Sequence, residues 1–154
     1  MNRISNLTVL FDASCGMCRG CRLWLSEQPS YFHLRFLALQ SPKVDTLFPG
    51  VREYRPMEQL IVIDDHGGIY QGADAWVICL CALKEYRGLA LKLADPGLRP
   101  LARSICQLIS KNRHKISNLL GLKSGEAFRR EAQKLVNDEI EMRPFCLCQM
   151  DGKC

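Results

Sequence analysis

Two cysteines with two residues between them, Cys15 and Cys18, are the residues of this chain best placed for chemistry. They follow an apolar run at residues 7–11 that predicts a short buried strand, and a helix is predicted over residues 19–28. A cysteine at the first turn of a helix faces unpaired N–H groups and the positive end of the helix dipole, which both favour its thiolate. We therefore expect Cys15 to be the attacking thiolate and Cys18, about one turn further along, to close a disulfide with it.

Asp12 lies three residues before Cys15 and has two candidate roles. Its carboxylate could accept hydrogen bonds from backbone amides near Cys15, as a turn or cap residue does. It could also be the base that deprotonates Cys18 when a mixed disulfide is resolved. A carboxylate close to the sulfur would oppose the thiolate, because a negative neighbour raises a thiol pKa. The role as a hydrogen-bond acceptor is favoured.

The composition is that of an ordinary soluble globular domain, with 154 residues, 47% of them hydrophobic and 24% charged. No apolar stretch approaches the length of a membrane span, and the longest, residues 73–83, is interrupted by Asp74. We expect no membrane partner. Nine cysteines without a recognisable export signal predict a cytoplasmic location, where thiols stay reduced.

The remaining pattern predicts an α/β domain with one parallel and one antiparallel strand pair. Strands are expected at residues 33–38 and 60–63, and turn chemistry after the second of these predicts a hairpin that ends at residues 69–71. Helices are expected from Ser41-Pro42 towards residue 48 and from residue 72 onwards, with a loop at residues 50–56.

A long helix is predicted before Gly121, with one apolar stripe facing the core. Asn112 falls inside that stripe, so we expect a buried amide that is hydrogen-bonded to backbone. The basic residues opposite the stripe predict a solvated face. The stripe consists of Leu98, Leu101, Ala102, Ile105, Leu108, Ile109, Ile116 and Leu120, and the basic face of Arg99, Arg103, Lys111 and Lys115, with His114 between them.

The motif formed by Asp12, Cys15 and Cys18 resembles the one for which the DCC family of thiol–disulfide oxidoreductases is named. The resemblance covers residues 7–120 and implies a thioredoxin-like α/β fold, with about four strands flanked by helices and a helical C-terminal extension. We expect a thioredoxin-like domain at residues 1–123, and a helix and cysteine-containing tail at residues 124–154. The other matching segments are Trp24-Leu25, residues 35–41, residues 72–75 and Asn112-Arg113.

The resemblance also implies an activity, the exchange of a dithiol with a disulfide-bearing protein or a low-molecular-weight thiol. This chemistry requires no cofactor. The chain departs from thioredoxins at Ser14 and Met17, where those proteins usually have Trp and Pro. Thioredoxin-like enzymes also present a cis-proline loop to their substrates, and the nearest proline to that position is Pro56.

Two other functions are compatible with the same residues. One is a zinc or iron–sulfur site with four thiolate ligands, drawn from three N-terminal and three tail cysteines. Core packing is favoured for Cys21, the third N-terminal cysteine, and also for Cys79, Cys81 and Cys106. A further alternative is that the tail cysteines pass disulfides to Cys15 and Cys18. The candidate ligands are Cys15, Cys18, Cys21, Cys146, Cys148 and Cys154.

The other alternative is a redox-inactive scaffold that binds a partner through the basic helix. An acidic protein would suit such a surface. Nucleic acid is disfavoured, because few aromatic residues lie among the basic ones and no nucleic-acid motif is present.

Overall fold

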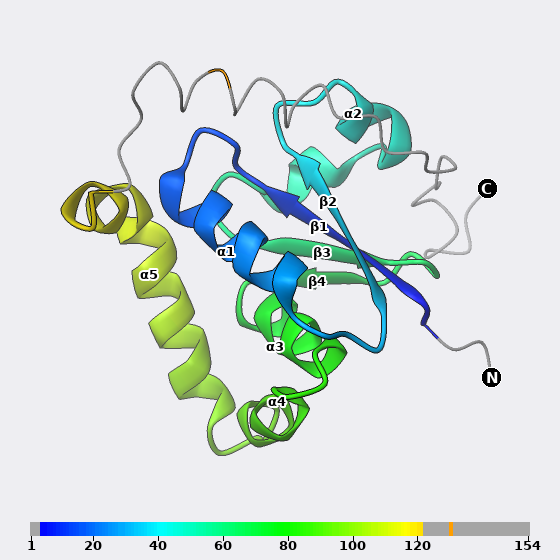
Figure 1. Cartoon of the computed structure of the whole chain (residues 1–154), viewed down its shortest axis with the longest axis vertical. Helices are drawn as coiled ribbons and strands as arrows, with labels where there is room; N and C mark the ends of the chain where they lie inside the picture. Colours follow the sequence, from blue (N-terminus) through cyan, green and yellow to red (C-terminus); the bar gives the residue numbers. More distant parts are fainter. Residues whose placement is uncertain (1–3, 122–129, 131–154) are drawn as a thin grey trace.

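A four-stranded mixed sheet forms the centre of the molecule, in a computed structural model that describes residues 4–121 and residue 130 (Figure 1). The strands are β1 (Asn6–Phe11), β2 (His33–Ala38), β3 (Ile61–Asp64) and β4 (Ile69–Gln71), in the order β2-β1-β3-β4. β1 is parallel to β2 and antiparallel to β3, which is antiparallel to β4. The predicted α/β, thioredoxin-like class is confirmed, and so are its parallel and antiparallel pairs.

Helices cover both faces of this sheet (Figure 1). Leu10, Ile61 and Ile63 pack on one face with residues of α2 and η1. Val9 and Val62 point the other way and pack with residues of α1 and α3. The helices are α1 (Gly16–Glu27), α2 (Lys43–Leu47), the short 3-10 helix η1 (Val51–Tyr54), α3 (Ala73–Ala82), α4 (Arg87–Leu93) and α5 (Arg99–Leu119).

Two short helices were not predicted. η1 lies inside the segment predicted as a loop, where Val51 is buried as part of the α2-side core. α4 buries Ala90 and leaves Leu89 and Leu91 about half exposed or more, at 49% and 62%. Its leucines therefore do not mark a buried face, and apolar periodicity gives no signal for it.

The prediction that the leucine stripe of α5 is buried is wrong for the described part of the chain. Leu101 and Leu108 are 59% and 64% exposed. α5 packs against α1 and α3 instead, and its partly or fully buried positions include the small residues Ala102, Ser110 and Ser117. Small residues allow close helix approach, whereas periodicity identifies an apolar face without identifying what covers it.

The basic side of α5 is also placed differently from the prediction. Arg99 and Arg103 both pair with Asp74 of α3, at 2.9 and 3.5 Å, so this side is turned in part towards the domain. Asn112 donates a hydrogen bond to the Leu108 carbonyl, as predicted, but it is only partly buried. The predicted helix and tail at residues 124–154 lie outside the described residues, apart from residue 130.

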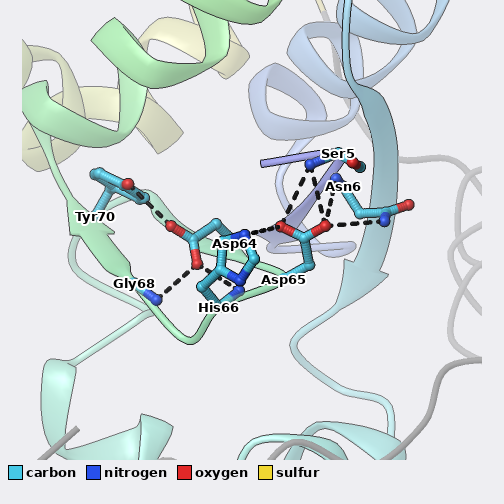
Figure 2. Close-up of polar contacts among 7 residues, drawn as sticks. All are labelled: Ser5, Asn6, Asp64, Asp65, His66, Gly68 and Tyr70. Atoms are coloured by element: carbon cyan, nitrogen blue, oxygen red, sulfur yellow. Dashed lines mark hydrogen bonds and ion pairs between the residues drawn. The ribbon is translucent and has the colours of Figure 1, made fainter. Parts of the chain in front are cut away.

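Two adjacent carboxylates fix the β3–β4 hairpin (Figure 2). The Asp64 carboxylate accepts hydrogen bonds from the backbone N–H groups of His66 and Gly68, both at 2.8 Å, and from the Tyr70 hydroxyl at 3.0 Å. Asp65 accepts from the backbone at the beginning of β1. The hairpin turn is thereby held against β1, and β4 lies at the edge of the sheet.

None of the helices in the described part of the chain is both long enough and apolar enough to cross a membrane.

Replacement of Gly68 by alanine should loosen this hairpin, because a Cβ atom at Gly68 would collide with the Asp64 carboxylate. We expect Gly68→Ala to lower the free energy of unfolding by about 1–3 kcal/mol in urea denaturation. Gly20→Ala is the matched control, since a Cβ there meets nothing within 4 Å inside α1. It should leave stability unchanged or raise it by up to about 1 kcal/mol. Equal midpoints for the two variants would contradict the role of Asp64.

Candidate redox site

Cys15 is the capping residue at the N-terminus of α1. β1 ends at Phe11, and a turn closed by a hydrogen bond from the Cys15 N–H to the Asp12 carbonyl, at 3.2 Å, leads into the helix. The Cys15 backbone is extended, and its sulfur accepts a hydrogen bond from the Cys18 N–H at 3.4 Å. The sulfur therefore takes the place of the usual cap oxygen and satisfies a helix N–H that would otherwise be unpaired.

The pKa values of the two thiols of the motif are shifted in opposite directions. A hydrogen bond with Cys18 lowers the pKa of Cys15 most, burial raises it, and the Cys18 N–H and the charge of Arg113 lower it further, to about 6. The same hydrogen bond raises the pKa of Cys18, and so do burial and the negative charge of Cys15. These contacts thus favour the thiolate at Cys15 and the protonated thiol at Cys18.

Asp12 is a buried carboxylate with hydrogen bonds from three residues. One oxygen accepts from the Ser14 N–H and hydroxyl and from the Gln40 amide, at 2.6 to 2.9 Å, and the other accepts from Arg113 at 3.2 Å. Burial raises the pKa of Asp12, but the hydrogen bonds from Ser14 and Gln40 and the charge of Arg113 outweigh burial and lower it. The predicted acceptor role towards the backbone is confirmed at Ser14.

Arg113 brings α5 to the site and connects two of its members. One guanidinium nitrogen lies 3.9 Å from the Cys18 sulfur and another 3.2 Å from an Asp12 oxygen, although 95 and 101 residues separate them in the chain. The Arg113 and Asp12 side chains are 11% and 1% exposed. No role was predicted from the sequence for Arg113 or Gln40, although both lie in segments that resemble the DCC family. A second signal for Arg113 is its place on the same side of α5 as Cys106 and Ser110, which are small and partly buried.

A small cavity of about 60 Å³ lies beside Cys18. Met17 and Cys21 of α1 line it together with Pro56 and Arg113. Cys21 therefore shares the side of α1 that Cys18 occupies, as predicted, but it faces a cavity rather than the centre of the core. Pro56 does approach the site, and every peptide bond of residues 4–121 is trans.

The DCC1-like thiol-disulfide oxidoreductase family matches residues 9–119 of the chain. The chain belongs to this family. The predicted resemblance to DCC proteins is thereby confirmed. Comparison with curated proteins and with solved structures gave no significant match.

All the cysteines of this DCC1-like chain that the structure describes are free thiols. Cys79 is fully buried, and the prediction of core packing is confirmed. For Cys81 and Cys106 it is wrong, because both are only partly buried, and Cys106 lines a surface groove. Within residues 4–121, no three histidine, cysteine or acidic side chains are grouped to hold a metal ion. The other proposed ligands, Cys146, Cys148 and Cys154, lie outside the described residues.

Removal of the Arg113 charge should raise the pKa of Cys15. We expect the thiolate absorbance at 240 nm to rise with pH at a midpoint well below that of free cysteine, and this step to be absent in Cys15→Ser. In Arg113→Met the midpoint should move up by roughly one pH unit. Arg113→Lys, which keeps the charge, should move it less, and Lys115→Met on the exposed side of α5 should leave it in place. An unchanged midpoint in Arg113→Met would remove Arg113 from the electrostatics of the site.

Removal of the Asp12 charge should cost stability, because Arg113 would then lose its carboxylate partner in a buried position. We expect Asp12→Asn to lower the free energy of unfolding by about 3–5 kcal/mol. Asp45→Asn breaks a comparable ion pair, Asp45–Arg52, whose side chains are 59% and 45% exposed, and it should have a much smaller effect. Similar losses in the two variants would show that burial does not distinguish the pairs.

Proposed function

We propose that this protein exchanges a dithiol and a disulfide through Cys15 and Cys18. The observation that carries the proposal is that two thiols one helical turn apart have pKa values shifted in opposite directions. The surroundings of Cys15 favour its thiolate, and those of Cys18 favour its protonated thiol. This difference suits exchange, because the thiolate is the attacking nucleophile and the second thiol reacts only after a mixed disulfide has formed. Membership of the family supports the same activity.

The reaction consists of two displacements. The Cys15 thiolate attacks one sulfur of the partner disulfide, the partner S–S bond breaks, and the leaving sulfur takes a proton from water. The Cys18 thiol then gives its proton to solvent and attacks the Cys15 sulfur. The mixed disulfide breaks, and the second partner sulfur leaves and is protonated. Two electrons pass from the cysteines to the partner, and a Cys15–Cys18 disulfide remains.

Asp12 acts in this proposal as a positioning residue. Its lowered pKa makes it a weak base, and it accepts hydrogen bonds from Ser14, Gln40 and Arg113 rather than from a thiol. It holds the turn that carries Cys15 and the guanidinium that lies beside Cys18. Its negative charge opposes the Cys15 thiolate, and the positive charge of Arg113 offsets that effect.

Access to Cys15 is a further requirement of the mechanism. Cys15 is 1% exposed, whereas Cys18 is partly exposed. Ser14, next to Cys15 in the turn, is exposed. We therefore expect the turn before α1 to open locally when a partner disulfide reaches Cys15.

The partner is a disulfide-bearing protein or a low-molecular-weight thiol, and the exchange itself needs no cofactor. A reducing compartment such as the cytoplasm is part of the proposal. It is supported by the nine cysteines of the chain, an odd number that cannot all be paired in structural disulfides, since free thiols persist where disulfides are continually reduced.

A redox titration in glutathione buffers tests the proposal. We expect a reversible two-electron transition, with alkylation and peptide mass mapping showing the disulfide between Cys15 and Cys18. Cys15→Ser and Cys18→Ser should both abolish the transition, and Cys18→Ser should accumulate a mixed disulfide at Cys15. Cys21→Ser is the matched control, one turn further along α1, and should titrate like the parent protein.

The proposal fails if Cys15 and Cys18 stay reduced across the range, or if other cysteines oxidise first. A mixed disulfide trapped on Cys18 in Cys15→Ser, with none trapped on Cys15 in Cys18→Ser, would reverse the roles of the two cysteines.

A further inference from the structure

A groove of about 940 Å³ adjoins the redox site and has no part in the chemistry described so far. α5 forms one wall, and the other side is lined by β4, the beginning of α3 and residues 57–59 before β3. Gln59, Ser110 and Arg113 line both this groove and the small cavity beside Cys18. A molecule lying in the groove would therefore end next to the cavity that Cys18 lines.

The α5 wall of this groove is cationic. The cationic side chains that line it are Arg99, Arg103, Lys111 and Arg113. The acidic residues of the lining are Asp74, which is shared between two of the arginines, and Glu58, which pairs with Arg55 outside the lining at 3.6 Å. Arg113 is neutralised by Asp12. Lys111 is exposed and adds a positive charge, so the groove favours an anionic ligand.

The opposite wall is an edge of the sheet. Ile69, Tyr70 and Gln71, which make up the whole of β4, line the groove. β4 pairs with β3 on one side, and no other described strand pairs with it. The edge of a sheet can accept an extended peptide as an additional strand. The contacts of Asp64 with Gly68 and Tyr70 hold this edge in place before any ligand arrives (Figure 2).

The length of the groove also fits a peptide. Its α5 wall runs from Arg99 to His114, which at about 1.5 Å per helical residue is roughly 22 Å. An extended chain covers this distance in about six or seven residues. The lining contains a single aromatic residue, Tyr70, and so lacks the stacking platforms by which single-stranded nucleic acids are bound.

We propose that this groove binds an extended acidic segment of a protein partner and delivers the partner's neighbouring cysteine to Cys15 and Cys18. The cations of α5 select the charge of the segment, and the edge of β4 selects its extended form. This inference rests on the proposed exchange activity for its purpose, but binding of the acidic segment itself requires no redox step.

A charge reversal inside the groove, matched by one outside it, tests the proposal. The probe is a fluorescent ten-residue peptide rich in Asp and Glu and free of cysteine, and binding is followed by fluorescence anisotropy at low salt. We expect Lys111→Glu to weaken binding roughly five- to tenfold. Lys115→Glu makes the same change of charge one turn further along α5, at an exposed position outside the groove, and should bind like the parent protein.

Three results would overturn the proposal. These are equal affinities of the Lys111→Glu and Lys115→Glu proteins, equal binding of a lysine-rich peptide, and tighter binding of a single-stranded oligonucleotide of matched charge. The last of these would assign the groove to nucleic acid. Both variants should keep the parent circular dichroism spectrum, since both lysines are exposed.

The redox activity is measured separately with hydroxyethyl disulfide, a small uncharged substrate. Exchange with this disulfide but no binding of the acidic peptide would refute the groove proposal without contradicting the exchange activity. Peptide binding that depends on Lys111, in a protein inactive towards every disulfide, would overturn the exchange activity and leave the groove as a site for acidic segments.

Discussion

A carboxylate buried at the end of β1 accepts hydrogen bonds from three other parts of the chain. Asp12 is 1% exposed, and it contacts the turn before α1, Gln40 after β2 and Arg113 of α5. A buried charge without partners would be strongly destabilising, so these segments must meet at one point for the fold to be stable. That point lies directly before Cys15. The requirement to satisfy one carboxylate therefore also sets the geometry of the thiols.

The electrostatics of the site result from two opposite charges held together. Asp12 raises the pKa of both cysteines, and Arg113 lowers both. Ion pairing between them reduces the net field, and the local hydrogen bonds then decide which sulfur is ionised. Cys15 accepts from the Cys18 N–H at the N-terminus of the helix, where a negative charge is most favourable. The asymmetry between two chemically identical side chains is thus a consequence of the hydrogen bonds that Cys15 receives at the N-terminus of α1, from the Cys18 side chain and from its backbone N–H.

The sequence was sufficient to predict the sheet and the local part of the site. Apolar runs separated by turn residues predicted all four strands, and the position of Cys15 before an amphipathic segment predicted its place at a helix N-terminus. The contacts of Asp12 with Gln40 and Arg113 span 28 and 101 residues, and no local pattern encodes such pairs. The apolar stripe of α5 predicted a helix correctly and its buried side wrongly. Hydrophobic periodicity describes one element, whereas burial depends on which neighbour packs against it.

The position of Arg113 has a consequence for the order in which the protein is made. The motif is complete once residue 18 has been synthesised, but the guanidinium that approaches it belongs to residue 113, 95 residues later. At about 5–20 residues per second, this interval is roughly 5–19 s of translation. During that time the two cysteines exist without the cation that favours the thiolate, and the carboxylate of Asp12 acts on them alone. The full reactivity of the pair therefore arises only when α5 has been made and has packed, so that a nascent or truncated chain carries the motif but not its finished chemistry.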